Sequence, residues 1–287
     1  MTTSSPSTAM WEMGLRLRAA RDRAGLSAEE AAAAIPVKSH YLNNVERGRR
    51  MLAEDKLAAL LELYEPSTDE HSELLALRRT SDTRGWWSHY GDVLQDSLLK
   101  LYSYEQGAHE IRSYESGLIS GLLQTERYAR AVHASDKANL RPSDVERRTE
   151  ARMRRQQRLH EPDPLHASIV MNEATLWQQV GGPDVLAEQL EHLIAAVEAE
   201  TPTIDLRIIP FTGGSYGALG SSTFHLLAFP SPKLTTLVWQ ESVTSLRLID
   251  DEMQLRQYHA SFAEALDRAA DHDTSRKLIQ AALEAIT

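Results

Sequence analysis

The sequence predicts a mainly α-helical protein with a C-terminal α+β part: an all-α helix-turn-helix domain followed by a larger domain of helices and an antiparallel sheet. Three observations predict this class. Apolar residues recur every three or four positions through the first 64 residues, between helix-start and helix-stop signals. Segments with strand-like composition occur only in the later part of the chain. The tail from Glu252 to Ile286 returns to a helical pattern, with an interruption near Asp271–Thr274.

Local signals divide the N-terminal part into four or five short helices. Ser27 and Glu30 form a capping box that starts the second helix, and Pro36 ends it. A third helix runs from about Lys38 to Arg47, with Gly48 at its C-terminus. The apolar positions of the first and fourth helices are Met10, Met13, Leu17, Ala20 and Ala24, then Leu57, Leu60, Leu61 and Tyr64.

We expect four parts along the chain. Residues 1–9 form a disordered leader, residues 10–65 the helix-turn-helix domain, residues 66–83 a linker helix and hinge, and residues 84–287 the α+β domain. Helix is expected over most of the stretch from Trp86 to about Leu159. Strands are expected in the segments HASIVM, IDLRIIP, STFHLLAF and LTTLVWQ.

Composition limits the classes of function. The chain has no cysteine, which excludes disulfides and thiol chemistry, and it has no long apolar run, so we expect no membrane span and a cytoplasmic location. The net charge is −10, which argues against a general nucleic-acid coat protein. The first 64 residues are nearly balanced in charge, so the charge permits DNA binding there without requiring it.

Residues 25–50 have the spacing of two short helices joined by a tight turn and followed by a basic loop, an arrangement that presents the second, polar helix to double-stranded DNA. Ala31 and Ala32 are small where the helices cross, and Val37, Leu42 and Val45 hold the presented helix. Polar side chains in its first turns suit base edges in the major groove, and the arginines that follow suit backbone phosphates. The predicted DNA-binding residues are Lys38, Ser39, His40, Asn43, Asn44, Arg47, Arg49 and Arg50. The alternative is a compact helical domain whose basic loop binds another protein.

The N-terminal part resembles the Cro/phage-repressor (Xre-like) helix-turn-helix family. The matching residues are M-G-x-R-L-R-x-x-R-x-x-x-G-L-S at 13–27 and V-x-x-x-x-L-x-x-V-E-R-G-R-R at 37–50. The resemblance implies that Ser39, His40 and Asn44 read bases, with Asn43 nearby.

The remainder is similar to the domain of unknown function that follows such modules in WhiJ-like actinobacterial regulators. Motifs that carry this similarity include R-G-W-W at 84–87, G-L-L-Q-T-E-R-Y-A-R-A at 121–131, N-E-A-T-L-W at 172–177 and G-S-S-T-F at 220–224. The similarity implies a regulator with a small partner protein.

The larger part offers no catalytic signature. The histidines are widely spaced, and neither an H-E-x-x-H motif, a phosphate loop nor a G-x-S-x-G elbow occurs, so we expect no enzyme, no metal and no cofactor. Two groups could bind a partner or ligand, although core packing and a salt-bridged surface are the simpler interpretations. They are the aromatic residues Trp86, Trp87 and Tyr90 and the arginines Arg148, Arg152 and Arg155.

The sequence therefore predicts a sequence-specific DNA-binding transcriptional regulator. A homodimer is expected, because one headpiece reads only half of a two-fold operator. The C-terminal domain is expected to sense a small partner protein or a ligand. The alternative function is an antitoxin-like or scaffold protein that mainly binds a small partner, with DNA binding secondary.

Overall fold

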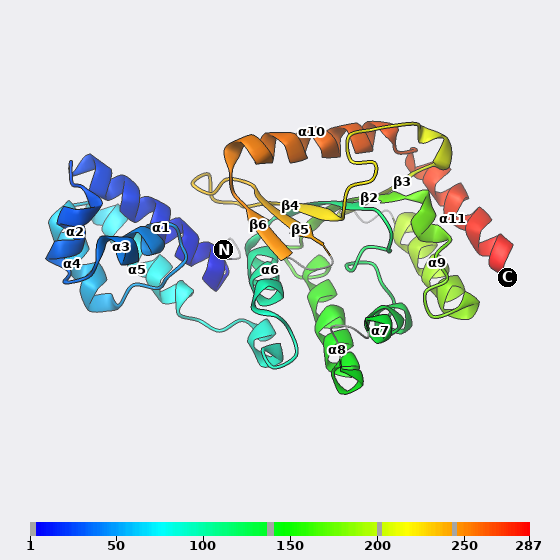
Figure 1. The fold of residues 1–287 in the computed structure, drawn as a ribbon, viewed down its shortest axis with the longest axis horizontal. Helices are drawn as coiled ribbons and strands as arrows, with labels where there is room; N and C mark the ends of the chain where they lie inside the picture. The colour runs from blue at the N-terminus through cyan, green and yellow to red at the C-terminus, as the bar shows by residue number, and fades with distance from the viewer. Residues whose placement is uncertain (1–3, 137–140, 200–202, 243–245) are drawn as a thin grey trace. The chain divides into compact units, whose positions relative to one another are not determined.

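The computed structural model describes residues 4–136, 141–199, 203–242 and 246–287. The chain forms two compact units, a headpiece that consists chiefly of the residues up to Ser88 and a C-terminal unit that starts at His89. The headpiece is helical, and the C-terminal unit combines helices with a six-stranded sheet, which confirms the predicted fold class (Figure 1). Within the described ranges, no helix is long and apolar enough to cross a membrane.

Five α-helices build the headpiece: α1 (Pro6–Arg23), α2 (Ala28–Ala34), α3 (Ser39–Glu46), α4 (Glu54–Tyr64) and α5 (Thr68–Ser81). The four helices predicted up to Tyr64 are confirmed, and α2 begins after Ser27 as its capping box predicts. All five helices contribute buried side chains to one hydrophobic core. Its members include Leu17, Ala31, Leu42, Leu57 and Leu74.

The prediction of a disordered leader over residues 1–9 is wrong from Ser5 onward. The Ser5 hydroxyl accepts a hydrogen bond from the Thr8 amide at 3.3 Å, and the Thr8 hydroxyl accepts one from the Ser5 amide at 2.9 Å. This capping box starts α1, and Pro6 stands at the first helical position, where its missing N–H and its restricted φ cost nothing. Ala9 is fully buried. Residues 1–3 lie outside the described residues.

The prediction of a linker helix over residues 66–83 is also wrong, because α5 belongs to the headpiece. Leu74 is fully buried in the headpiece core. Arg23 of α1 pairs with Glu70 at 2.6 Å, and Arg16 of α1 pairs with Glu73. The Arg78 guanidinium donates a hydrogen bond to the carbonyl of Leu52 at 2.6 Å. Helix α5 therefore packs along α1 as part of the same core.

A mixed six-stranded sheet forms the centre of the C-terminal unit. The strands are β1 (Glu110–Glu115), β2 (His166–Asn172), β3 (Ile204–Ile209), β4 (Phe224–Ala228), β5 (Leu237–Glu241) and β6 (Leu246–Ile249). Their order is β3-β2-β1-β4-β5-β6, with β1, β2 and β3 parallel and the other pairings antiparallel. The four predicted strand segments correspond to β2, β3, β4 and β5, and the sheet is mixed where we expected it to be antiparallel.

Two strands, β1 and β6, escaped prediction, and β1 lies inside the sheet between β2 and β4. Only Ile111 and Tyr114 of β1 are apolar, and successive strand residues point to opposite faces, so these two side chains lie on different faces. Apolar residues therefore do not alternate along β1. The expectation of helix through this stretch is wrong for residues 110–115.

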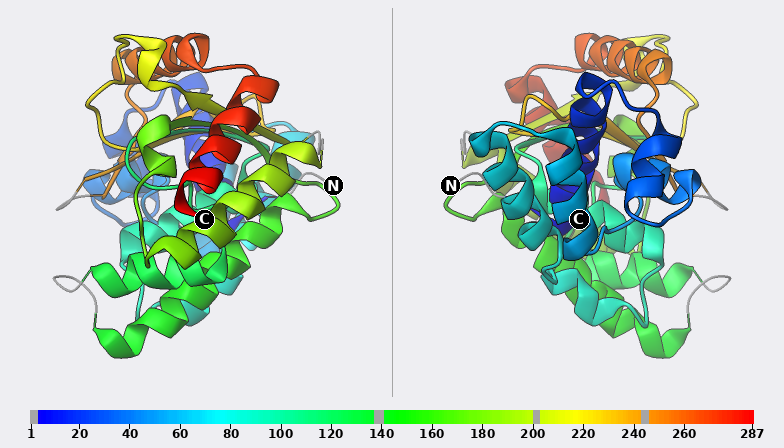
Figure 2. Two further views of the ribbon diagram at one scale, coloured as in Figure 1. Left: turned by 90° about the vertical axis from the view of Figure 1, so that its right-hand side faces the viewer. Right: turned by 90° about the vertical axis from the view of Figure 1, so that its left-hand side faces the viewer.

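Helices cover both faces of the sheet. They are α6 (Asp96–Gly107), α7 (Glu126–Ser135), α8 (Val145–Gln156), α9 (Pro183–Glu198), α10 (Glu252–Arg268) and α11 (His272–Ile286). Helix α10 crosses one face, and α6, α8 and α9 lie on the other side (Figure 1). Helix α11 runs beside α9 and contacts β3 (Figure 2). Short 3-10 turns link these elements: Trp86–Tyr90, Pro142–Asp144, Gln157–Leu159, Glu173–Leu176 and Phe211–Gly213.

The sheet face opposite α10 carries a buried polar cluster. The Ser113 hydroxyl donates to Glu115 at 2.6 Å and lies 2.8 Å from Nδ1 of His225, so the neutral His225 ring donates its Nδ1 proton to Ser113. Burial raises the pKa of Glu115 to about 6 and lowers that of His225 to about 3, with the nearby Arg155 guanidinium lowering the latter further. At pH 7 the His225 ring is therefore neutral, whereas Glu115, whose pKa stays below 7, is mostly ionised and accepts the hydrogen bond from Ser113.

His133 on α7 makes the C-terminal unit sensitive to acid. Burial, together with the charges of Arg152 and Arg148, lowers its pKa to about 3, whereas the unfolded ring titrates near 6.5. The unfolded chain then binds the extra proton between these pH values, so the free energy of unfolding falls as the pH falls through this window. We expect His133→Gln to weaken this loss, measured by urea unfolding followed by circular dichroism between pH 7 and pH 4.5. Equal pH dependence in the two proteins would contradict it.

Candidate nucleic-acid interface

The turn between α2 and α3 is set by a capped helix and by small side chains. The Ser27 hydroxyl accepts a hydrogen bond from the Glu30 amide at 3.2 Å, and the Glu30 carboxylate accepts one from the Ser27 amide at 2.8 Å. Ala31 and Ala32 are buried where α2 meets α3, as predicted from their size. The Val37 amide donates back to the carbonyl of Ala32 at 3.1 Å and closes the turn.

A buried ion pair anchors the C-terminal end of α3. Nε and Nη2 of Arg21, in the last turn of α1, lie 2.7 and 3.0 Å from the two carboxylate oxygens of Glu46. Nη1 of Arg21 donates to the carbonyl of Leu26 at 2.8 Å. Leu42 and Val45 of α3 are fully buried beside this pair, which confirms their predicted contacts. The inner side of α3 is therefore fixed both by apolar packing and by a bidentate charge pair.

Two glycines allow α1 and the end of α3 to approach closely. A Cβ atom on Gly14 would lie 2.4 Å from the carbonyl oxygen of Val45, and one on Gly48 would lie 2.5 Å from Cα of Trp11. Gly48 also has a φ of +65°, which favours glycine. The Gly48 amide donates to Val45 at 2.9 Å and the Arg49 amide to Asn44 at 2.8 Å, the pattern of a Schellman motif.

The predicted DNA-binding residues lie on α3 and on the loop that follows it. His40, Asn43, Asn44 and Arg47 are three or four positions apart, so they share the helix face opposite the buried residues. The side-chain amide of Asn44 donates to the carbonyl of His40 at 3.0 Å. Lys38, His40, Arg47, Arg49 and Arg50 are exposed, and Ser39, Asn43 and Asn44 are partly exposed.

Sequence reasoning missed Tyr41, which organises the basic loop after α3. Its hydroxyl donates to the carbonyl of Met51 at 3.0 Å. The Arg50 guanidinium carbon and the Lys56 ammonium nitrogen each lie 5.7 Å from the centre of the Tyr41 ring. Such cation–π contacts hold two positive groups beside the polar face of α3. The only sequence signal for this role of Tyr41 is its position in the helix before the basic loop, because the sequence does not show which residues contact its ring.

Two of the three aromatic residues proposed for partner binding are buried, packed side chains. Trp87 and Tyr90 are buried, and the rings of Trp86 and Trp87 meet edge to face at 5.8 Å. The Arg147 guanidinium lies 5.7 Å from the centre of the Tyr90 ring. This burial favours the packing interpretation for Trp87 and Tyr90, and a role for Trp86 in binding stays a prediction.

The three arginines of α8 that were predicted to bind a partner all bond to groups of the C-terminal unit. Arg155 is buried and pairs through two guanidinium nitrogens with Glu105 of α6, at 2.5 to 3.0 Å, so the prediction of a partner contact is wrong for Arg155. Arg148 donates to the carbonyl of Val93 at 2.7 Å, and Arg152 donates to the Gln124 side chain at 2.6 Å. Arg148 and Arg152 stay partly exposed, and their binding role stays a prediction.

The Arg21–Glu46 pair generates a prediction about the order of α3. Glu46→Ala leaves the buried Arg21 without its partner, and breaking a buried pair costs about 3 to 5 kcal/mol. We expect the amides of α3 to lose protection against hydrogen exchange. The exposed Glu62→Ala is the control, and the double variant Arg21→Met/Glu46→Leu, which removes both charges, should regain much of the stability. Unchanged protection of α3 in Glu46→Ala would refute the anchoring role.

Comparison with known families agrees with this geometry. Residues 12–74 match a helix-turn-helix domain, a range that includes the first half of α5. Residues 98–281 match a domain of unknown function (DUF5753). No curated protein and no solved structure matches the chain. Because the second match spans more than half of the chain, the protein belongs to the family that carries this domain of unknown function, here behind a helix-turn-helix headpiece.

Proposed function

We propose that this protein is a sequence-specific transcriptional regulator that binds double-stranded DNA by inserting α3 into the major groove. The observation that carries the proposal is the two-sided character of α3. Its inner side is held by Leu42, Val45 and the Arg21–Glu46 pair, and its outer side presents polar side chains followed by arginines. A rigid helix with these properties is how helix-turn-helix domains place side chains at base edges.

The two ends of the interface have different chemical roles. Ser39, His40, Asn43 and Asn44 carry hydrogen-bonding groups for base edges, and an asparagine amide matches the adjacent donor and acceptor of adenine. Lys38, Arg47, Arg49 and Arg50 carry the charges that bind backbone phosphates and set the register of the helix on DNA. Tyr41 holds Arg50 and Lys56 close to this basic end.

We also propose that the protein acts as a homodimer in the cytoplasm and is not an enzyme. The support for a dimer is general, since one headpiece contacts only a half-site and two-fold operators favour paired headpieces. The C-terminal unit is proposed to sense a ligand or a small partner protein, as the resemblance to WhiJ-like regulators implies. A molecule that binds one arrangement of the headpieces better than another would shift operator affinity by that difference.

Selection of duplexes from a random library, followed by fluorescence anisotropy, tests DNA binding directly. We expect Asn44→Ala to lose about 1 to 3 kcal/mol of discrimination at one base pair. Arg49→Ala should weaken all duplexes alike and lower the salt slope by about 1. The control is Arg127→Ala, which removes an exposed charge of α7. Absence of binding at low salt, where phosphate attraction is largest, would refute the proposal.

Two substitutions of Tyr41 distinguish the effect of its hydrogen bond on DNA binding from the effect of its cation–π contacts. Tyr41→Phe keeps the ring beside Arg50 and Lys56 and loses only the hydrogen bond to Met51, so DNA affinity should change little. Tyr41→Ala loses both cation–π contacts and should weaken all duplexes alike, by roughly tenfold. Anisotropy titrations at two salt concentrations measure this. A loss confined to one base position in Tyr41→Ala would show that Tyr41 reads sequence and does not organise the loop.

A further inference from the structure

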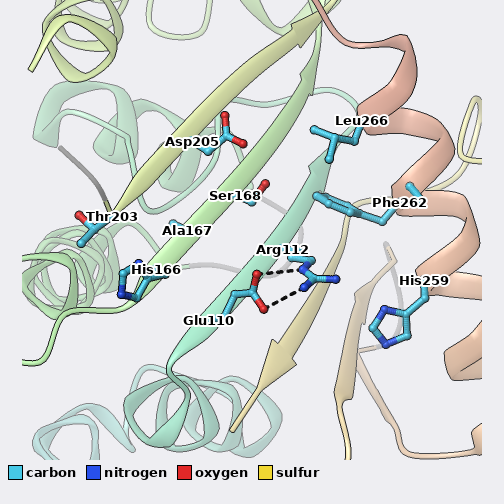
Figure 3. A pocket seen from close by; sticks show the side chains of 11 residues that line it. Glu110, Arg112, His166, Ala167, Ser168, Thr203, Asp205, His259, Phe262 and Leu266 are labelled. Atoms are coloured by element: carbon cyan, nitrogen blue, oxygen red, sulfur yellow. Dashed lines mark hydrogen bonds and ion pairs between the residues drawn. The ribbon is translucent and has the colours of Figure 1, made fainter. Parts of the chain in front are cut away.

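The sheet face under α10 changes from apolar to polar along the three parallel strands. Near their carboxyl ends, Tyr114, Val170 and Ile209 pack with Phe262 of α10 in one hydrophobic core. Near their amino ends, the same face carries Glu110, Arg112, His166, Ser168 and Asp205. A pocket of about 430 Å³ lies over this polar part of the sheet (Figure 3). This volume lies within the range of pockets that bind small molecules.

Three side chains form a row across the floor of the pocket. Arg112 of β1 pairs in register with Ser168 of β2, and Ser168 pairs with Asp205 of β3. Residues in register on adjacent strands point to the same face, so a positive group, a hydroxyl and a negative group follow one another (Figure 3). Neighbouring strands are about 4.8 Å apart, which places the backbones of Arg112 and Asp205 about 10 Å apart.

The end groups of this row are charged and keep free bonding positions. Arg112 binds Glu110 through Nε and Nη2, both at 3.0 Å, and its Nη1 has no hydrogen-bond partner among the described residues. Oδ1 of Asp205 accepts from Arg207 at 3.0 Å and from His272 at 2.7 Å, whereas Oδ2 accepts no bond within the same ranges. Partial burial acts to raise the pKa of Asp205, but the bonds from His272 and Arg207 lower it overall, so Asp205 is ionised.

The middle of the floor and the wall complete the pocket. The Ser168 hydroxyl makes no side-chain hydrogen bond in the part of the chain that the structure describes. Phe262 and Leu266 of α10 point over the strands and form an apolar wall (Figure 3). His259 also lines the pocket, and burial together with the charge of Arg112 lowers its pKa, so its ring is neutral at pH 7. Among the described residues, no cluster of three or more histidine, aspartate and glutamate side chains could hold a metal ion.

From this geometry we propose that the pocket binds a small zwitterion about the length of a dipeptide. Its ammonium group lies against Oδ2 of Asp205 and its carboxylate against Nη1 of Arg112. Ser168 bonds the polar group between them, and an apolar side chain packs on Phe262 and Leu266. A role for this ligand as an effector of DNA binding rests on the proposed function. The binding of the ligand to the pocket does not.

The length of the ligand follows from the row. An extended dipeptide spans about 7 Å. The backbones of Arg112 and Asp205 are about 10 Å apart, so the two charged ends of the ligand must also lie several ångströms apart. A single amino acid has its two charges on one carbon and cannot reach both end groups. The arrangement therefore favours a ligand that separates its charges by one peptide unit.

Calorimetry with the full chain and no DNA tests the site. The probes are unmodified dipeptides with alanine, leucine or phenylalanine as second residue, such as Ala-Phe, and their N-acetylated and C-amidated forms. We expect at least one unmodified dipeptide to bind with a Kd on the order of 0.1 mM. Its acetylated form lacks the ammonium charge and its amidated form lacks the carboxylate, so each should bind at least tenfold more weakly.

Variants locate the binding on the polar row. Asp205→Asn should weaken dipeptide binding at least tenfold, and Ser168→Val, which fills the floor and disturbs no side-chain bond, should do the same in a folded protein. Arg127→Gln, outside the pocket, should bind as the unchanged chain does. The proposal is overturned if no dipeptide binds saturably, if the capped forms bind equally well, or if Ser168→Val has no effect. Because DNA is absent, failure of DNA binding would leave this result unaffected.

Discussion

The headpiece depends on one interaction, the buried pair between Arg21 and Glu46. The pair joins the last turn of α1 to the last turn of α3 through two hydrogen bonds, and the remaining Arg21 nitrogen binds the carbonyl of Leu26. Removing two charges from water costs several kcal/mol per ion, so the pair adds little net stability compared with apolar residues of similar volume. Its contribution is geometric, since a bidentate pair fixes both the position and the rotation of α3.

That rotation determines what α3 can present. Gly14 and Gly48 let α1 and the end of α3 touch through backbone atoms, where any side chain would separate them. The Schellman motif at Gly48 satisfies the last carbonyls of α3 internally. The side chains of Arg49 and Arg50 are consequently not needed to cap the helix: Arg50 lies beside the Tyr41 ring, and Arg49 is exposed to solvent. The close contact between α1 and the end of α3 therefore has two effects. It fixes the inner side of α3, and it leaves the polar side chains of the outer side available for binding.

Sequence reasoning succeeded where structure is determined locally. The capping box at Ser27 and Glu30, the glycine after α3 and the small residues of α2 act within a few positions, so the pattern reports them. It failed where the burial of a segment depends on residues far away in the sequence. Helix α5 looked like a linker because the burial of Leu74 depends on α1, and the arginine stripe of α8 looked like a surface because Glu105, which pairs with Arg155, lies fifty positions earlier. Periodicity alone cannot distinguish an inward charged face from an outward one.

Strand β1 is a strand that the sequence did not predict, and the residues that prevented its prediction lie at two polar sites of the sheet. Its polar residues concealed the strand, because an inner strand is expected to be apolar. Those residues instead serve the two faces separately: Ser113 and Glu115 join the buried cluster with His225, and Glu110 and Arg112 form one end of the pocket beneath α10. Sequences depart from the pattern of their fold mainly at functional or strained sites. An inner strand that uses four of its six positions for polar groups is such a departure, and it directs attention to the sheet of the C-terminal unit.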